Sequence, residues 1–404
     1  MKDAKNSSKI YLSPPHMSGN ELKYIGDAFK TNFIAPIGEN ITLFEKSIKE
    51  YVGTSEVLAT NSGTAAIHLA LILAGVGPGD LVICQSFTFA ASANPIKYLG
   101  ASPIFIDSEE ETWNMDPDSL EEAIEASIKG NLEKYSELDE IKNINPQIPK
   151  AIIVVHLYGM PAKMDKINQI GEKYGIKIIE DSAEAIGSSI YGKQCGTFGD
   201  FGIFSFNGNK IITTSGGGAL VSNDSSAMDE ARCLSTQARD NYIHYQHSKI
   251  GYNYKITNIT AGIGIAQMEV LNDRVASRRN NFDTYKYLLK EENYIKFLEE
   301  PHGYKSNRWL TTIVFDDAMG IVPNDLVASL NERGIETRPL WKPMHMQPIY
   351  KNYPYFGKNL SEKLFRNGLC LPSGSALDQE TITLICSALK EVIKKSLLAN
   401  AVLK

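Results

Sequence analysis

The chain has 404 residues, which is too long for one small hydrophobic core, so two or three domains are expected. Its composition, with 43% hydrophobic and 22% charged residues, is that of an ordinary globular protein and excludes a disordered or fibrous chain. The 41 basic and 47 acidic residues give a net charge of -6 without a dense basic block, which argues against a nucleic-acid partner.

Cysteine usage and hydropathy indicate a reduced, soluble protein. The five cysteines are odd in number, widely spread and never paired as Cys-x-x-Cys, which argues against a disulfide framework and against a metal site. The N-terminal residues are polar and lack the apolar core of a signal peptide. The most apolar stretch, Thr64 to Val76, carries His68 and is too short to span a bilayer. A cytoplasmic protein without membrane insertion is therefore expected.

Two helices are predicted at the start of the chain. The first runs from Gly19 to about Phe29, with Leu22, Ile25 and Phe29 on one stripe. The second carries apolar residues at helical spacing from Ile41 to Tyr51. The segment between them, residues 32–38, is punctuated by a proline and a glycine and is predicted to be a loop. Because this loop is apolar, we expect it to be covered.

From Glu56 onward, short β-type runs alternate with helical ones. The predicted strands are Val57 to Thr60, Leu81 to Cys84, Pro103 to Asp107, Ala151 to His156 and Ile176 to Asp181. The predicted helices are Thr64 to Ala74, Ala90 to Leu99, Pro117 to Ala126 and Met164 to Tyr174. Such alternation predicts βαβ units and a mostly parallel sheet covered on both faces. Ligands then bind beyond the carboxyl ends of the strands, where Asp181 and residues 60–64 and 86–89 fall.

The rest of the chain divides into an insertion and a smaller domain. Lys129 to Lys150 is rich in Lys, Glu and Asn and is predicted to be a surface insertion. After Asn272 the pattern predicts a charged helix, a strand, a helix and a long final helix, which together indicate an α+β domain. The charged helix contains Arg274, Arg278 and Arg279, the strand is Trp309 to Phe315, and the helices are near Asn324 to Arg333 and from Asp378 to about Leu398. We place the domains at residues 1–272 and 273–404, with residues 1–20 as a segment that can pack elsewhere.

One lysine lies in an unusual setting. The run Phe204-Ser205-Phe206-Asn207-Gly208-Asn209-Lys210 passes from a short β-forming stretch into a polar turn, and a glycine cluster follows at Gly216-Gly217-Gly218. A lysine on a tight turn in a cleft can act as a Schiff-base nucleophile. Most lysines are solvated surface charges, so the residues of this run alone favour a solvated turn lysine.

Two further motifs change the balance. Asn61-Ser62-Gly63-Thr64-Ala65-Ala66 joins a strand to a helix, and can be an anion site for a phosphate or an ordinary turn capped by Thr64. Asp181 at a strand end can cap the next segment, or it can pair with the protonated pyridine nitrogen of pyridoxal phosphate. No P-loop or Rossmann fingerprint is present. Phosphate cradle, carboxylate and lysine in this chain order are a much rarer combination than any one of them.

With these motifs the sequence resembles the DegT/DnrJ/EryC1/StrS family of pyridoxal phosphate-dependent sugar aminotransferases, of fold type I, from about Ile10 to Ser375. Within the family it is most similar to the enzyme that aminates C4 of a UDP-linked 4-keto sugar on the way to UDP-N,N′-diacetylbacillosamine. Besides the Lys210 run, the resemblance is carried by Leu12-Ser13-Pro14-Pro15-His16-Met17, Ser86-Phe87-Thr88-Phe89, Glu180-Asp181-Ser182-Ala183-Glu184-Ala185-Ile186-Gly187, Ser235-Thr236-Gln237-Ala238-Arg239, Gly251-Tyr252-Asn253-Tyr254 and Arg338-Pro339-Leu340-Trp341.

The resemblance implies a mostly parallel seven-stranded sheet in a large cofactor-binding α/β domain, followed by a smaller α+β domain. It implies that Lys210 forms the Schiff base, that Asp181 holds the pyridine nitrogen and that Phe89 lies against the ring. The phosphate ligands implied are Thr64, the amide of Ala65, Ser205 and, from the neighbouring subunit of a homodimer, Asn253.

Three positions depart from this pattern or stand outside it. Glu184 occurs where many relatives have Gln or His beside the phenolic oxygen of the cofactor, so its role there is open. Lys163 occurs where many relatives have an aspartate, and we expect it to concern the surface or the sheet edge. His156, at a strand end, is expected to be a hydrogen-bonded structural histidine rather than a catalyst.

The resemblance implies transfer of an amino group from L-glutamate to C4 of a UDP-linked 4-keto-6-deoxy sugar, with the freed Lys210 moving protons. Arg338, Trp341 and His345 are the candidates for contact with the sugar nucleotide. Amination of a dTDP-linked keto sugar at C3 is the alternative within the class, and a pyridoxal phosphate-binding module without catalysis is the alternative outside it. A 3-dehydrase of the same fold uses His in place of the lysine, so Lys210 argues against it.

Overall fold

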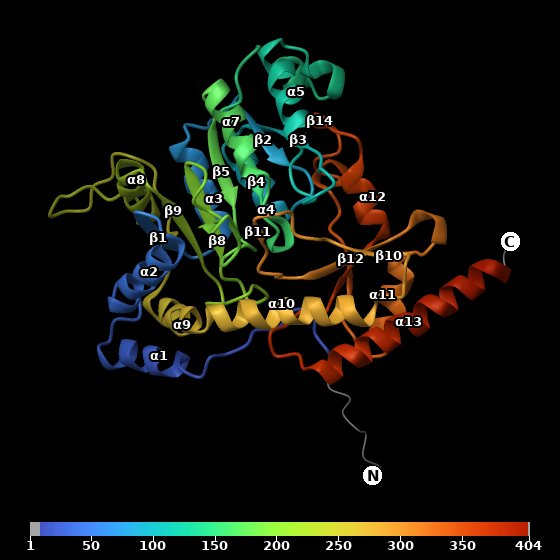
Figure 1. Ribbon diagram of the computed structural model, residues 1–404. Coiled ribbons are helices and arrows are strands. Elements are labelled where there is room, and N and C mark those ends of the chain that lie inside the picture. The colour runs from blue at the N-terminus through green and yellow to red at the C-terminus, as the bar shows by residue number, and fades with distance from the viewer. Residues whose placement is uncertain (1–8, 403–404) are drawn as a thin grey trace.

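The computed structural model describes residues 9–402, so the polar N-terminus at residues 1–8 lies outside the described part. A large sheet organises the first two thirds of the chain (Figure 1). Its eight strands follow the order β1-β9-β8-β5-β4-β2-β3-β14. Their bounds are β1 Glu56–Thr60, β2 Leu81–Gln85, β3 Ser102–Ile106, β4 Ala151–Val155, β5 Lys177–Asp181, β8 Phe201–Ser205, β9 Gly218–Ser222 and β14 Tyr355–Phe356.

The sheet is mostly parallel, as the sequence predicts. Only β9 runs antiparallel to its neighbours, and it pairs with both β1 and β8. Seven strands come from residues 56–222, while the two-residue β14 is added at the edge from a much later part of the chain. The five strands predicted from β-type runs are β1 to β5, with no end shifted by more than one residue.

Helices cover both faces of the sheet, which explains why its strands are apolar throughout. Alternate residues such as Val82 and Ile153 pack with α3 (Gly63–Leu73), α4 (Ala90–Tyr98) and α8 (Ser225–Ser235). Their neighbours Ile83 and Ile152 pack with α5 (Pro117–Ile128) and α7 (Met164–Tyr174) on the opposite face. Both sets of side chains are removed from water, so no polar alternation remains.

The two predicted N-terminal helices are confirmed as α1 (Glu21–Lys30) and α2 (Glu39–Val52), which pack with α9 (Asn258–Glu269). The prediction that the apolar loop 32–38 is covered is wrong for this chain alone, and the apolar stripe of α1 is exposed in the same way. Leu22 is 80% exposed, Phe29 is 61% exposed, and the apolar side chains of loop 32–38 are also largely exposed. The apolar stripe therefore faces away from the chain's own core.

A second, antiparallel sheet lies at the other end of the molecule, with strand order β10-β12-β15-β13. Its strands are β10 Ile295–Phe297, β12 Thr311–Phe315, β13 Arg338–Pro339 and β15 Gly368–Leu371, and its helices are α11 Pro323–Glu332, α12 Leu360–Asn367 and α13 Gln379–Val402. The long helix α10 (Leu271–Leu288) runs along the base of both sheets (Figure 1). The division at residue 272 stays a prediction.

The remaining elements are short. A three-stranded sheet is formed by β11 (Tyr304–Lys305), β6 (Ser189–Ile190) and β7 (Lys193–Gln194). The predicted insertion contains α6 (Asp139–Lys142) and the 3-10 turn η1 (Leu132–Tyr135), each with one buried apolar residue. Other 3-10 turns are η2 (Leu157–Gly159), η3 (Asp317–Met319) and η4 (Met344–Met346). Between residues 9 and 402, no helix is long and apolar enough to cross a membrane.

Candidate active site

A cavity of about 910 Å³ opens beyond the carboxyl ends of β1, β5 and β8. Its wall includes Asp181 at the end of β5, Ser205 at the end of β8 and Lys210 in the following turn. Arg338 and Trp341, from the part of the chain near the second sheet, close it on another side. The structure thus brings together residues that are far apart in sequence, at the edge of the sheet where a ligand was expected.

Lys210 is largely shielded from solvent, in contrast to an ordinary surface lysine. Its side chain is only 12% exposed, and its amide donates to the carbonyl of Asn207 in the predicted tight turn. The Nζ atom lies 3.3 Å from Glu184 Oε1 and 4.3 Å from the centre of the Trp309 ring. An amine held between a carboxylate and an indole inside a cavity has the setting of a covalent nucleophile.

Asp181 caps a turn and also lines the cavity. Its Oδ1 accepts a hydrogen bond from the amide of Ala183 at 3.2 Å, which caps the turn after β5. Its Oδ2 accepts one from Ser92 Oγ at 2.6 Å, and Ser92 is in turn 2.7 Å from Thr88 Oγ1. The carboxylate is buried yet lines the cavity. It is thereby held in place as a negative charge that a cationic ligand atom can meet.

Glu184 is the other acidic group at the lysine. Its Oε2 accepts a hydrogen bond from the amide of Tyr158 at 2.7 Å, while Oε1 faces Lys210. Burial raises the pKa of Glu184 to about 7, and Lys210 and the Tyr158 amide lower it in part. A carboxyl group with this pKa can be present in either protonation state near neutral pH, and its protonated form can donate a hydrogen bond to a phenolic oxygen.

The N-terminus of α3 supplies an anion site beside Ser205. Ser62 is the cap of α3, in place of the Thr64 considered above, because its Oγ accepts from the amide of Ala65 at 3.1 Å. The first helical amides have no partner within a helix, and Ser62, Gly63 and Thr64 all line the cavity. A Cβ at Gly63 would lie 3.2 Å from that of Ser205, so glycine permits this close approach. The predicted phosphate contact of Ala65 competes with its existing bond to Ser62.

Two aromatic rings and one arginine form the outer wall. The rings of Phe89 and Trp341 lie 5.7 Å apart, and Phe89 is 61% exposed. The Trp341 amide donates to Tyr158 Oη at 2.9 Å, which fixes this segment to the cavity wall. Arg338 also lines the cavity and pairs with Glu336 at 2.8 Å. These residues occupy positions from which a substrate can be contacted.

His345 lies elsewhere, which corrects its expected place in the site. Its Nδ1 is 2.7 Å from Ser86 Oγ and its Nε2 is 3.3 Å from Glu362 Oε1. Its ring stacks on Tyr355 at 3.7 Å. His345 therefore joins η4 to the end of β2 and to α12, and it is not part of the cavity wall.

Asn253 does not line the cavity of its own chain either. It is exposed, and its carbonyl accepts a hydrogen bond from Asn61 Nδ2, a residue of the cavity rim, at 3.0 Å. Its predicted delivery to a neighbouring subunit stays a prediction. Lys163 forms ion pairs with Glu109 and Glu111 outside the cavity wall.

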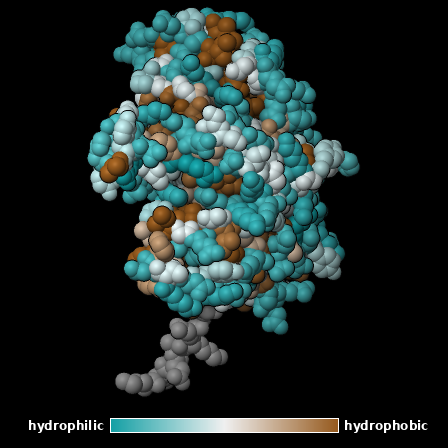
Figure 2. Space-filling view, turned by 90° about the vertical axis from the view of Figure 1, so that its left-hand side faces the viewer, coloured by the Kyte–Doolittle hydropathy of each residue, from teal (hydrophilic) through white to brown (hydrophobic). Residues whose placement is uncertain are grey.

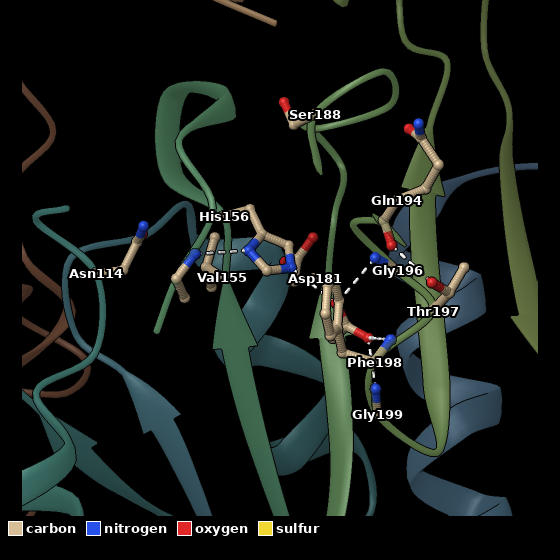
Figure 3. A network of polar contacts seen from close by, with 12 residues as sticks. Asn114, Val155, His156, Asp181, Ser188, Gln194, Gly196, Thr197, Phe198 and Gly199 are labelled. Atoms are coloured by element: carbon tan, nitrogen blue, oxygen red, sulfur yellow. Dashed lines mark hydrogen bonds and ion pairs between the residues drawn. The ribbon is translucent and has the colours of Figure 1, made fainter. Parts of the chain in front are cut away.

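His156 belongs to a buried network around Glu180, next to Asp181 in the chain (Figure 3). Its Nδ1 accepts from the amide of Ala162 at 2.9 Å, so Nε2 carries the proton that is donated to Glu180 at 2.9 Å. Glu180 also accepts from the amides of Gly196, Phe198 and Gly199. The histidine is therefore neutral and holds the loops at the end of β5, in agreement with its predicted structural role.

Sequence reasoning missed Trp309 and Ser13 as parts of the site. Both line the cavity, and both donate a hydrogen bond to the carbonyl of Asn209, directly before Lys210. Ser13 lies in a run that marks the family resemblance, but its spacing does not place it beside residue 209. Trp309 has only the pattern of a strand start.

The residues of the cavity fit pyridoxal phosphate. Lys210 supplies an amine, Asp181 a buried negative charge, and the start of α3 with Ser205 a set of donors for a phosphate. Phe89 supplies an aromatic face. These groups come from four separate segments of the chain, and each has the chemistry that one part of the cofactor requires.

Comparison with known proteins agrees with this geometry. Residues 15–390 match the DegT/DnrJ/EryC1/StrS aminotransferase family. The chain is 52% identical, over 92% of each chain, to the candidate pyridoxal phosphate-dependent aminotransferase EpsN of Bacillus subtilis (strain 168). It is 34% identical to the GDP-perosamine synthase of Caulobacter vibrioides, over 95% of this chain and 98% of that protein.

Solved structures add the cofactor. The pyridoxal phosphate form of Spr1654, a candidate sugar aminotransferase from Streptococcus pneumoniae, superimposes with a TM-score of 0.83 over 96% of this chain and 99% of that chain, at 26% identity. With the family match over most of the chain, the fold type I architecture is shown. The chain therefore belongs to the DegT/DnrJ/EryC1/StrS family and is a pyridoxal phosphate-dependent aminotransferase of sugar nucleotides.

Proposed function

We propose that this aminotransferase moves the amino group of L-glutamate to C4 of a UDP-linked 4-keto-6-deoxy-N-acetylhexosamine. The product is UDP-4-amino-4,6-dideoxy-N-acetylglucosamine, as used in bacillosamine-type glycan biosynthesis. The observation that carries the reaction class is the buried Lys210 between Glu184 and Trp309, in the same cavity as the Asp181 carboxylate. The UDP-linked 4-keto substrate rests on the sequence runs of the close subgroup.

The roles of the residues follow from their places in the cavity. Pyridoxal phosphate, when bound, supplies an electron sink that stabilises a carbanion next to nitrogen. Asp181 would keep the ring nitrogen of the bound cofactor protonated by its negative charge, and Ser92 holds that carboxylate in position. Lys210 Nζ takes the proton from the α-carbon of the amino donor and later returns a proton to the sugar carbon. Thr64, Ser205 and the amides at the start of α3 hold the phosphate.

The outer wall provides a place for the nucleotide sugar. Phe89 and Trp341 present apolar faces on which a base or sugar ring can lie, and Arg338 brings a positive charge near them. Glu336 partly compensates that charge through its 2.8 Å ion pair. A diphosphate can displace the carboxylate from Arg338, which gives the substrate an anionic anchor.

We also propose a cytoplasmic homodimer in which Asn253 completes the neighbouring site. The side of the molecule that carries α1, α2 and the loop after α8 is seen in Figure 2, where hydrophobic clusters interrupt a mostly hydrophilic surface. On these elements, Leu22, Phe29, Ile243, Tyr245 and Ile250 are largely exposed. Burying such side chains against a second copy removes apolar area from water and supports an interface here.

Two other substrates are the main competitors. A dTDP-linked sugar aminated at C3 uses the same lysine and carboxylate, so these residues do not discriminate. A GDP-linked sugar is the second competitor, and the observation that supports it is the 34% identity to a GDP-perosamine synthase. A binding module without catalysis would leave the buried Lys210–Glu184 pair without a use.

The test is a substrate panel. The purified enzyme is incubated with L-glutamate and UDP-, GDP- or dTDP-linked keto-6-deoxy sugars, and the products are examined by mass spectrometry and NMR. We expect the amine at C4 of the UDP-linked sugar, with a kcat/KM at least about tenfold above the other nucleotides, or about 1.4 kcal/mol of discrimination. Preferred amination of the GDP- or dTDP-linked sugar, or amination at C3, would contradict the proposal.

A further inference from the structure

The peptide that precedes Lys210 is held from outside its own loop. The carbonyl of Asn209 accepts a hydrogen bond from Ser13 Oγ at 2.7 Å and another from Trp309 Nε1 at 2.8 Å. One donor comes from the N-terminal segment and the other from the entrance of β12, so neither moves with the turn. The ring of the same Trp309 lies 4.3 Å from Lys210 Nζ.

Arg278 of α10 holds both of these donors. Its Nη2 donates to Ser13 Oγ at 3.0 Å, and its Nη1 donates to the main-chain carbonyl of Trp309 at 2.5 Å. Ser13 Oγ thus accepts from Arg278 and donates to Asn209, while Trp309 is fixed at its backbone and donates from its indole. One planar guanidinium is the common anchor of two arms that meet at the peptide before Lys210.

Burying the Arg278 guanidinium without an ion pair is unfavourable, so the two hydrogen bonds that it donates are the feature that an apolar side chain at this position would lack. Arg278 is 1% exposed, makes no ion pair with any residue between 9 and 402, and its Nε atom has no partner there. Burial, together with the nearby Arg274, lowers the pKa of Arg278 to about 9. An unpaired buried charge is unfavourable, and an apolar side chain would fill the same volume. What an apolar side chain lacks is the pair of rigidly diverging donors.

We propose that Arg278 is a positioning residue for transamination, which acts through Ser13 and Trp309 on the main chain of Lys210. The lysine must reach different carbon atoms of its ligands with the same amine, and small displacements of a reacting group are expensive. The hydrogen bonds from Arg278 through Ser13 and Trp309 leave the side chain of Lys210 free to move and fix the main chain that carries it. They also tie residues 10–13 and the second sheet to the same turn, through Ser13 and Trp309.

The experiment compares Arg278→Met with a matched control, Arg274→Met. Arg274 lies one turn earlier on the same face of α10 and donates to the carbonyls of His16 and Met17, but its side-chain hydrogen bonds within residues 9–402 do not include Ser13, Trp309 or Asn209. Three quantities are measured on the holoenzyme: the thermal midpoint, the circular dichroism of the bound cofactor, and the single-turnover rate of amino transfer from glutamate. The cofactor signal reports its orientation relative to the protein, independently of turnover.

Both variants are expected to unfold at lower temperature, because each loses a network of buried hydrogen bonds. Only Arg278→Met is expected to change the cofactor circular dichroism and to slow the single turnover, by about tenfold to a hundredfold. Arg278→Lys should recover part of this loss, since an ammonium can reach one arm but does not match the planar fork. Arg278→Met with the spectrum and single-turnover rate of wild type would overturn the proposal.

Ser13→Ala keeps the proposal testable if Arg278→Met does not fold. It deletes one hydroxyl, and it should produce the same spectral change with a smaller loss of rate. If Arg278→Met does fold, the losses of the two variants should not add in the double variant, because Ser13→Ala removes one of the two contacts that Arg278→Met already disrupts. A normal cofactor spectrum and rate in Ser13→Ala, or strictly additive losses, would show that Arg278 only supports the fold.

Discussion

Among single residues, Asp181 is expected to affect catalysis through its negative charge. Asp181→Asn keeps the size of the side chain and its contact with Ser92, but it removes the negative charge that keeps a ring nitrogen protonated. We expect the single-turnover rate with glutamate to fall by at least about a hundredfold, or about 2.7 kcal/mol. Cofactor binding at the phosphate end should be nearly unchanged in an absorbance titration. A variant within a few-fold of wild type would mean that Asp181 only caps the turn to Ala183.

Glu184 has a pH-dependent consequence. Burial raises its pKa from 4.5 to about 7, so between these values the folded apo-protein binds more protons than the unfolded chain. Stability therefore falls as the pH rises through this window. Glu184→Gln removes the titration, and we expect its free energy of unfolding to fall less over the same window, by on the order of 1–3 kcal/mol.

Denaturant unfolding of the apo-protein near both ends of the window measures this effect. Glu336→Gln is the matched control, because Glu336 lines the same cavity but hydrogen bonds and Arg338 lower its pKa despite burial. A group with a lowered pKa titrates below the window, so this variant should keep the wild-type slope. Equal slopes in wild type and Glu184→Gln would contradict the raised pKa.

At the scale of elements, the start of α3 has two competing uses for one amide. Ser62→Ala removes the acceptor of the Ala65 amide and should destabilise the apo-protein by about 1 kcal/mol. The freed amide becomes available to a phosphate, so the affinity for pyridoxal phosphate should be equal or higher. Thermal unfolding of the apo-protein and a cofactor titration measure the two effects. A large loss of affinity would instead make Ser62 itself the phosphate ligand.

Helix α10 was predicted as a charged helix, but two of its three arginines are buried in the structure. Its arginines predict a charged helix, and Arg279 does pair with Glu300. Arg274 and Arg278 instead point into the protein, where they donate to the N-terminal segment and to the entrance of β12. The charges of Arg274 and Arg278 therefore serve to join distant segments rather than to face water.

At the scale of the whole molecule, the proposed shared site predicts complementation. Lys210→Ala keeps an intact Asn253, and Asn253→Asp keeps an intact Lys210 while it places a carboxylate where a phosphate is expected. Each variant alone should be inactive. In a mixed dimer one site collects both changes and the other collects none, so random mixing should restore about a quarter of wild-type activity.

The control is a mixture in which both changes are on the same chain and the partner is wild type. In that mixture subunit exchange should not raise the activity, because both sites of each mixed dimer contain one changed residue. Subunit exchange is followed by native mass spectrometry with one chain tagged. If exchange occurs and the two single variants regain no activity, Asn253 does not serve the neighbouring site.

The sequence alone predicted most strands and helices of the large sheet and singled out Lys210 and Asp181 as site candidates. Strands β1 to β5 and the helices between them were predictable because both faces of a parallel sheet are buried, which leaves continuous apolar runs separated by helical periods. Lys210 and Asp181 were singled out because they lie in short contiguous runs that resemble motifs of the family, although the Lys210 run alone favoured a solvated lysine. The two-residue β14 was not predicted, since so short a strand lacks a periodic signal, and the antiparallel β9, which starts within the glycine cluster, was not predicted either.

The groups that surround Lys210 could be identified only from the tertiary structure. Trp309 and Ser13 reach the lysine turn across 100 and 196 residues of sequence, and no local pattern encodes such contacts. His345 lies outside the cavity wall, where its ring contacts Ser86 and Glu362 through its two nitrogens and stacks on Tyr355. The apolar stripe of α1 faces outward, because a helical period shows that one face is apolar but does not show what will cover it.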